Sequence, residues 1–503
     1  MRSAGGFAVY LLHLVLGGYI SLGAPVDQSF FIPNELKYRH VLQAVYGLDP
    51  THFVWGPGNR ETLENLIRAS EDEGLNPNDY RADKTDPSLR NESLRDLAQS
   101  DRFLALVHDL RFGQADHLRY SIVKENQTEF LTQQLAALYA GEPLSKSLLE
   151  ELTPQNHQYL NLKIEFSSWH SLLPDQNKFG FRMSGAAILR PGDYNAQVMI
   201  LRELLDSYGF KSVTPLDPQG FDENLRLALQ LFQQRFGLRP TGIADLRSIR
   251  ELNRSPTERL KSLATSMDLW RALPRDLGTK FLLINLSEAW ARLYRDDLLI
   301  FQSAVLIGTK KSPTSTMVSQ IESIDLHPSW HIPSKIARNE ILPKVQADPY
   351  YLSNRGIRIQ ERSTGKTISI ANIDWSKVSS KNLPYRFIQE PGPLNPLGEI
   401  RFNLVNPFAI HIHDTSEPAL FTQENRLRTH GCLRVERARE LAKLLIPSLN
   451  DNLERVLSEP PTRRYRFPLG QSLSVYVVDL PVWTEGSSVR FIESAADKGT
   501  GQP

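Results

Sequence analysis

The sequence predicts an α+β multidomain protein, in which a helical scaffold and a three-helix module precede a mostly β domain with an inserted subdomain. Three observations support this fold class. A length of 503 residues suggests roughly two to four domains, and a hydrophobic content of 41% is ample for their cores. Apolar residues recur at helical spacing up to about residue 256. Past Gly278 they gather into short runs broken by turns, a pattern typical of β-strands.

Residues 1–23 are expected to form a signal peptide or a membrane anchor. Arg2 precedes a mostly apolar run from Phe7 to Leu22, and small residues follow. A cut after Gly23 would satisfy the small-x-small rule through Ser21. The alternative is an uncleaved anchor of about twenty residues, barely enough to span a bilayer. In either case we expect the rest of the chain to be exported to the periplasm or cell envelope, with membrane attachment only through the N-terminus.

Residues 24–190 are predicted to be the helical scaffold. Leu63 and Leu66 belong to one apolar helical face, and Phe103 begins another. Gly74 and Gly113 are positioned to end these helices. Polar residues are dispersed, without a cluster of His, Asp and Glu, so we expect no catalysis here.

Residues 191–256 are predicted to be the three-helix module. Asn195 precedes a first helix, Leu225 to Phe236 form a second, and a third follows Gly242. The leucines and phenylalanines of the second helix recur at steps of three or four, so we expect a buried core face and not a ligand site.

Residues 257–484 are expected to form the mostly β domain. Residues 330–395 interrupt its strand pattern and are predicted to be an inserted, lid-like subdomain, the alternative being a plain connecting loop. Within it, Ala337 to Leu342 is expected to be a short helix ended by Pro343. A helix from Val435 to Leu445 and a strand from Leu473 to Val478 should complete the domain, and 485–503 should form a polar tail.

Charge excludes some classes of partner. The formal net charge is +1, and no basic run is interleaved with aromatic residues, so nucleic-acid binding is not expected. The sequence indicates no oligomeric state.

The candidate functional residues gather around Cys432, the sole cysteine of the chain, which therefore cannot form an intramolecular disulfide. A thiol with histidines nearby in sequence could attack a carbonyl, if one imidazole accepts its proton and later passes it to the leaving amine. The alternative is a small buried residue without chemistry.

The neighbouring residues suit acyl transfer. Gly431 permits close backbone approach, and the N–H groups around Cys432 could hold an oxyanion. Asp414 or a backbone carbonyl could orient the base. Arg434 could bind a substrate carboxylate, or it could be an ordinary surface charge.

A zinc site is the rival interpretation. His411, His413, His430 and Cys432 would supply four ligands of the usual types. Their spacing matches none of the common zinc patterns, however, and alternate residues of a strand share one face and could simply line a pocket. We therefore predict neither a metal nor a cofactor.

Taken together, His413, fifteen intervening residues and Thr429-His430-Gly431-Cys432-Leu433-Arg434 resemble the signature of bacterial L,D-transpeptidases. The stretches Gln389 to Gly398, Trp330 to Pro333 and Met267 to Arg271 resemble the large multidomain branch of that family. Ala228 to Gly242 resembles a peptidoglycan-binding module, which implies glycan strands and stem peptides as partners.

The resemblance implies that Cys432 is the nucleophile and His413 the base, with His430, Gly431 and Arg434 at the other motif positions. Many members of the branch have Ser where His430 stands. The implied reaction cleaves a stem tetrapeptide after its third, diamino acid residue, releases D-alanine and crosslinks two stems, a role in cell wall biogenesis and cell shape. The alternatives are an L,D-carboxypeptidase, attachment of another amine to the wall, or a zinc-bound structural wall-binding protein.

Overall fold

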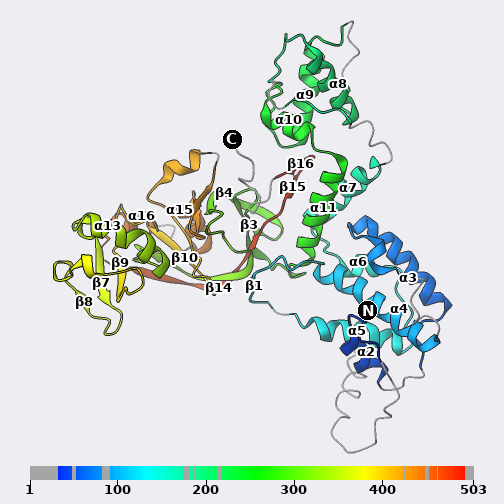
Figure 1. The fold of residues 1–503 in the computed structure, drawn as a ribbon, viewed down its shortest axis with the longest axis horizontal. Helices are drawn as coiled ribbons and strands as arrows, with labels where there is room; N and C mark the ends of the chain where they lie inside the picture. Colours follow the sequence, from blue (N-terminus) through cyan, green and yellow to red (C-terminus); the bar gives the residue numbers. More distant parts are fainter. Residues whose placement is uncertain are drawn as a thin grey trace, which may run out of the picture. The chain divides into compact units, whose positions relative to one another are not determined.

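The computed structural model describes residues 32–47, 52–81, 91–123, 125–173, 180–184, 188–211, 217–423, 425–447, 452–461 and 463–492 (Figure 1). The expected signal peptide or anchor at 1–23 lies outside these residues. Within them, no helix is both long and apolar enough to cross a membrane. The chain divides into two units. The helical unit comprises Met1–Asp116, Lys124–Arg275 and Val482–Phe491, and the barrel unit comprises His117–Val123, Asp276–Pro481 and Ile492–Pro503.

The N-terminal part of the helical unit is a helical scaffold, as predicted. Asn91 caps its longest helix by accepting a hydrogen bond from the Ser93 N–H, and Gly113, at φ 85°, follows the last turn. Its leucine-rich faces pack into one core. The elements are α2 (Arg39–Tyr46), α3 (Pro57–Ala69), η1 (Ser70–Glu73), η2 (Pro77–Tyr80), α4 (Glu92–Phe112), α5 (Gln127–Tyr139), α6 (Leu148–Leu152) and α7 (His157–His170).

The three-helix module consists of α8 (Ala196–Ser207), α9 (Glu223–Arg235) and α10 (Leu246–Leu252). Asn195, Asp222 and Asp245 cap their N-termini through side-chain oxygens. Leu225 and Phe232 are fully buried, which confirms that the apolar stripe of the second helix is core. The α+β multidomain fold class predicted from the sequence is confirmed.

Two further pieces complete the helical unit, and here the structure differs from the expected boundaries. Helix α11 (Pro256–Arg271) belongs to this unit and not to the domain expected from 257. Strands β15 (Val482–Glu485) and β16 (Ser488–Phe491) form a hairpin where a polar tail was expected from 485. The Phe491 ring lies 6.5 Å from that of Trp169 and 6.3 Å from that of Phe236. Apolar residues alternate in this short segment and become buried, although its overall composition is polar.

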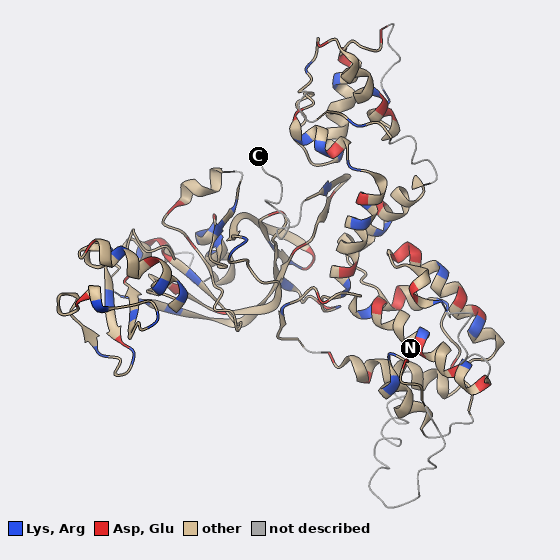
Figure 2. Ribbon diagram, viewed as in Figure 1, with Lys and Arg blue, Asp and Glu red and all other residues tan. Residues whose placement is uncertain are grey.

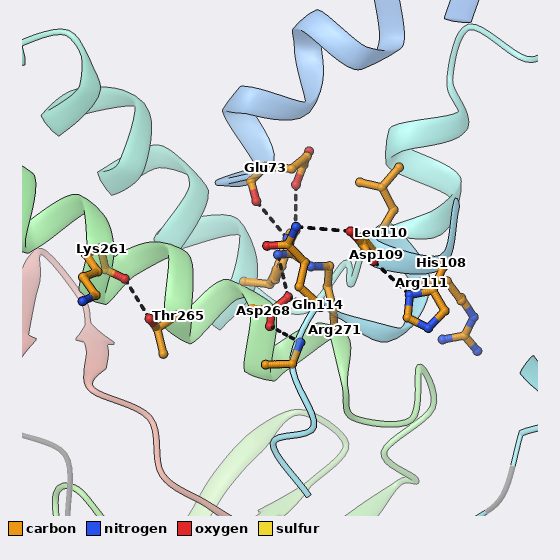
Figure 3. Close-up of polar contacts among 12 residues, drawn as sticks. Glu73, His108, Asp109, Leu110, Arg111, Gln114, Lys261, Thr265, Asp268 and Arg271 are labelled. Atoms are coloured by element: carbon orange, nitrogen blue, oxygen red, sulfur yellow. Dashed lines mark hydrogen bonds and ion pairs between the residues drawn. The ribbon is translucent and has the colours of Figure 1, made fainter. Parts of the chain in front are cut away.

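A buried polar network holds α11 against the scaffold (Figure 3). Arg271 donates from Nη1 to the Glu73 carbonyl at 2.8 Å and from Nη2 to Asp268 Oδ1 at 3.1 Å. Asp268 also accepts the Gln114 N–H at 2.7 Å. Because the Arg271 guanidinium is buried together with partners on several elements, it fixes their packing. The stretch from Met267 to Arg271 is therefore structural.

The barrel unit is built on one closed sheet. Its strands follow the order β1-β5-β10-β11-β13-β4-β3-β2-β14, with β12 paired to β4, and β14 also pairs with β5, which closes the ring. The sheet packs around an apolar core to which helices α15 (Ala438–Leu445) and α16 (Leu453–Ser458) contribute. The strands are β1 (Tyr120–Ser121), β2 (Lys280–Asn285), β3 (Trp290–Arg295), β4 (Leu298–Gly308), β5 (Met317–Leu326), β10 (Ile400–Leu404), β11 (Ile412–His413), β12 (Leu427–Thr429), β13 (Leu433–Val435) and β14 (Tyr465–Val478).

The sequence predicted most of these strands but not all of their extents. The runs at 298–300 and 304–307 belong to the single strand β4. Strand β1 lies in the segment expected to be scaffold, and it pairs in parallel with β5. Helix α15 starts at Ala438 and not at Val435, since residues up to Val435 pair in the sheet.

The inserted subdomain has its own small sheet, in the order β6-β9-β7-β8, and its own apolar core around Phe387 and Trp375. The predicted helix end at Pro343 is wrong. Pro343 lies in the first turn of α13 (Leu342–Ala347), directly after the π-helical turn η5 (Ala337–Ile341). Proline fits a first turn because its missing N–H has no intrahelical partner there. The other elements are α12 (Ser334–Ile336), α14 (Tyr351–Asn354), β6 (Trp330–His331), β7 (Ile357–Glu361), β8 (Thr367–Ile368) and β9 (Tyr385–Gln389).

Charges of both signs are interspersed over the elements of both units (Figure 2). Many are paired at the surface, as Arg439 is with Glu454 at 3.0 Å. This distribution agrees with the net charge of +1.

Candidate functional site

The ionisable residues of the candidate site form a cross-strand row on one face of the barrel sheet. His413 on β11 pairs with Arg434 on β13 and with Arg401 on β10. Arg401 pairs in turn with Asp325 on β5. Because directly opposed residues point their side chains to the same face, these four residues share one face, which we call the site face.

Cys432 and His411 lie two residues before Arg434 and His413, and therefore on the same face. The N–H of Leu433 donates to the His411 carbonyl at 2.9 Å, which holds the two segments side by side. The residues between them point the other way, into the barrel core: Ile412 and Leu433 are fully buried there. Strand alternation thus separates an apolar core from a polar site face.

His413 is oriented through its own neighbour. Its Nδ1–H donates to the Asp414 carbonyl oxygen at 2.6 Å, which leaves Nε2 as the basic nitrogen. The side chain is 3% exposed. Burial, reinforced by the charge of Arg434, lowers the pKa of His413 to about 3. The imidazole is therefore neutral at physiological pH and available as a base.

Cys432 is half-buried and unbonded to sulfur. Burial raises the pKa of its thiol, and the hydrogen bond with the His411 backbone and the charges of Arg434 and Arg401 oppose that rise. The unliganded site thus holds a neutral thiol and a neutral imidazole, and not a thiolate–imidazolium pair.

The turn before Cys432 requires glycine. Gly431 has φ 111°, a conformation that residues with a Cβ rarely adopt. The Thr314 hydroxyl donates to the Gly431 carbonyl at 2.9 Å. The Thr429 hydroxyl accepts the Gly431 N–H at 3.1 Å and donates to the Cys432 carbonyl at 2.6 Å. These bonds fix the backbone on both sides of the thiol.

Asp414 and Arg434 support the site differently. The Asp414 carboxylate accepts the Glu399 N–H at 3.1 Å, so the Asp414 carbonyl, and not its carboxylate, orients His413. Arg434 donates from Nη1 to Glu417 Oε2 at 3.0 Å and to Thr415 Oγ1 at 3.3 Å. Its Nε is buried without a partner in the described structure, so Arg434 is more than a solvated surface charge.

His430 is directed to the inserted subdomain. Its Nε2 lies 2.8 Å from Glu340 Oε1 on η5, and its side chain is 56% exposed. The structure therefore does not bring His430 together with His413 as a second group on the site face. It makes His430 a contact between the turn before Cys432 and the inserted subdomain.

A metal site finds no support in this geometry. Within the described residues, no group of three or more His, Cys, Asp or Glu side chains is arranged to hold a metal ion. Two of the four ligands of the zinc interpretation have other partners: His413 donates to a carbonyl oxygen and His430 faces Glu340.

Sequence reasoning missed Arg401 and Thr314. Both are distant in sequence from Cys432 and reach the site only through strand pairing and the turn after β4. The alternation of Arg401 with buried Ile400 and Phe402 was a signal for a site-facing position.

Comparison with known families extends this description. The L,D-transpeptidase catalytic domain model (YkuD) matches residues 279–451, which include the whole site face row from Asp325 to Arg434. A scaffold domain model matches residues 40–165, and a model described as "Putative peptidoglycan binding domain" matches residues 194–252.

A curated relative from Haemophilus influenzae, described as "Putative L,D-transpeptidase", is 31% identical over 209 residues. The match covers 41% of this chain and 42% of the relative, so the chain spans less than half of the relative's length.

Two solved L,D-transpeptidase structures are also similar. The one from Stackebrandtia nassauensis is 14% identical, with 57% of this chain and 94% of that chain covered and a TM-score of 0.21. The one from Xylanimonas cellulosilytica is 11% identical, with 57% and 96% covered and a TM-score of 0.18. Such TM-scores carry no argument by themselves. The family matches do: the chain is a multidomain protein that joins a scaffold domain and a peptidoglycan-binding domain to an L,D-transpeptidase catalytic domain.

Proposed function

We propose that the protein is a cysteine L,D-transpeptidase that crosslinks peptidoglycan stems through an acyl-enzyme on Cys432. The observation that carries the proposal is the shared sheet face of Cys432 and His413, inside the residues that match the catalytic domain model. His413 is the base, because its Nδ1–H is bonded to a carbonyl and its Nε2 is free to accept a proton.

In the first half-reaction, Cys432 Sγ attacks the carbonyl of the third residue of a donor stem tetrapeptide. The thiol proton passes to His413 Nε2 as the S–C bond forms, so no thiolate has to persist in the buried site. The N–H groups of Gly431 and Leu433 already have acceptors. The Cys432 N–H is therefore the donor we assign to the oxyanion. The C–N bond then breaks, His413 returns the proton to the leaving amine, and D-alanine is released.

In the second half-reaction, an amine on a neighbouring stem attacks the thioester. His413 takes a proton from that amine, the C–S bond breaks, and His413 returns the proton to the departing sulfur of Cys432, which leaves an amide between two third residues. Water as acceptor gives the carboxypeptidase outcome instead, and another amine gives attachment to the wall. All of these outcomes share the same acyl-enzyme.

The other domains suit this substrate. Residues 191–256 would bind glycan strands or stem peptides. The catalytic domain would comprise the barrel residues Asp276–Pro481, with 330–395 as a lid. Peptidoglycan as substrate implies an envelope location, reached by export through residues 1–23.

The test is a crosslinking assay with purified peptidoglycan and the Cys432→Ala variant. Crosslinks between third residues should form with the wild-type chain and be absent with Cys432→Ala, while both proteins bind the wall material equally. Full crosslinking by the variant would refute the mechanism. D-Alanine release without crosslinks would assign the carboxypeptidase outcome.

A further inference from the structure

Arg401 occupies a distinctive place on the site face. It lies directly opposite His413 in the sheet, on the side away from Arg434, so that the two arginines flank the imidazole. Its positive charge acts on Cys432 and on His411 as well. Arg401 therefore shares the site face with the thiol and adds positive charge to its surroundings.

The Arg401 guanidinium is held in place from one side only. Its Nη2 donates to Asp325 Oδ2 at 2.5 Å, while the Nε–H is buried and has no partner in the described structure. His411 Nδ1, two residues before His413 on the same face, is also buried without a partner. Buried polar atoms are normally bonded, so these two unpaired atoms on neighbouring strands of one face point to a place where a ligand could bind.

The local charge favours an anion. Asp325 is shared by two guanidinium groups, since Arg466 donates to it from Nε at 2.8 Å and from Nη2 at 3.1 Å. Two positive charges therefore face one carboxylate. His411 adds no charge of either sign, because burial lowers its pKa to about 4 and leaves the imidazole neutral at physiological pH. The group of four residues carries a net positive charge beside Cys432.

We propose that Arg401, oriented by Asp325 and assisted by His411, forms a subsite that binds a carboxylate of the donor stem peptide. The subsite rests on the function proposed above and deepens it, because it selects among stem peptides. Two carboxylates could supply the ligand: that of the terminal D-alanine, or the second carboxylate of a third residue that is a diamino dicarboxylic acid. Arg401 would be a specificity residue, and Asp325 a positioning residue.

The energetics favour this assignment over a purely structural ion pair. A structural ion pair needs only one guanidinium for the Asp325 carboxylate. Arg466, whose side chain is 66% exposed, already pairs with Asp325, so a structural role does not require Arg401. With its Nε–H buried and unpaired on the site face, the Arg401 guanidinium has a donor left for a ligand. A charged hydrogen bond of this kind changes affinity by about ten- to a hundredfold.

The experiment compares three donor tetrapeptides with the wild-type chain. One has meso-diaminopimelic acid as its third residue and a free terminal D-alanine. The second replaces the diaminopimelic acid by lysine, which lacks the second carboxylate, and the third ends in D-alaninamide. The specificity constant kcat/KM for acylation should fall about ten- to a hundredfold for one of the two altered donors, and that donor identifies the bound carboxylate.

Variants then assign the effect to Arg401. In Arg401→Gln the reference donor should be acylated as slowly as the altered donor, and the preference between them should disappear, whereas Arg401→Lys should keep part of it. Arg455→Gln, an equal loss of charge at an exposed ion pair on α16, should keep the full preference. Equal rates of the wild type on all three donors would overturn the subsite, as would a preference that persists in Arg401→Gln. Wild-type protein that turns over none of the donors would refute the proposed function itself.

Discussion

Burial determines the protonation states of the two central side chains. His413 is nearly inaccessible, and the same desolvation that lowers its pKa to about 3 raises that of Cys432. In the proposed mechanism, the thiol proton therefore moves as the S–C bond forms, and the thiol stays neutral until a donor is bound. The sequence could not reveal this, because desolvation depends on strands that pack around the pair.

The first prediction is that the rate of acylation does not fall at acidic pH as it does when a histidine base of ordinary pKa becomes protonated. Since the His413 pKa is about 3, its imidazole stays an unprotonated base as the pH falls from 7 towards about 5. Acylation of Cys432, followed as kcat/KM, should therefore stay level over that range. A loss of half the rate near the ordinary histidine pKa of about 6.5 would contradict the burial argument.

The second prediction concerns Gly431→Ala. A Cβ would have room, with Pro313 O 3.5 Å away, but φ 111° would be strained by about 1–3 kcal/mol. We expect at least a tenfold loss of kcat as the turn relaxes and the thiol moves. Gly470→Ala is the matched control, because that glycine has open space and no such φ, and it should keep full activity. Equal behaviour of the two variants would count against the account of the turn.

At this scale the sequence predicted what lies close together along the chain. The resemblance to the family motif singled out His413 and Cys432 together, and Gly431 was expected to permit close backbone approach. Arg401, Asp325 and Thr314 reach the site through pairing with distant strands, which a single sequence does not encode locally. The sequence also could not predict that His430 points towards Glu340, since this contact depends on how the inserted subdomain folds.

Among the elements, the inserted subdomain is notable for having its own apolar core. Phe387 is 1% exposed and packs with residues of η5, α13 and β7. The sequence predicted an insertion from its break in strand pattern, but it misplaced the helix end at Pro343. Proline signals a boundary and does not tell whether a helix ends or begins there.

The third prediction follows from that separate core. Phe387→Ala should destabilise the subdomain by about 3–5 kcal/mol, and hydrogen exchange should accelerate in β7, β9 and α13 while β2 and β3 stay protected. Tyr350→Ala, at a site that is 71% exposed, should change neither region. Equal acceleration in β2 and β3 would show that the subdomain does not open by itself.

On the scale of the whole molecule, neither unit is a continuous stretch of chain. Residues 482–491 belong to the helical unit, although they follow the barrel unit in the sequence. Strand β1, in the segment 117–123, belongs to the barrel unit, although helices of the helical unit flank it in the sequence. The apolar pattern of the sequence predicted a helical part followed by a mostly β part, as the structure has them. It did not predict that these segments belong to a unit distant in sequence. Strand β16, for example, has four residues with two buried side chains, too short a pattern to recognise in a polar segment.

The fourth prediction concerns the hairpin of β15 and β16, which belongs to the helical unit. Phe491→Ala removes a ring that packs on Trp169 and Phe236 and lies 4.7 Å below the Arg259 guanidinium. We expect a loss of about 3 kcal/mol in the helical unit, seen as faster hydrogen exchange in α7, α9 and α11, with β3 unchanged. Leu231→Ala on the exposed side of α9 serves as the control. Unchanged exchange in α7 and α11 would mean that the hairpin does not stabilise this unit.

Cys432 carries the acyl group in the proposed mechanism, and intact mass spectrometry of the protein with a stem tetrapeptide would detect that group. We expect an adduct with the mass of the tetrapeptide less D-alanine, mapped to Cys432 and absent from Cys432→Ala. Release of D-alanine by the folded wild-type chain without any covalent adduct, or an adduct that persists in Cys432→Ala, would contradict it.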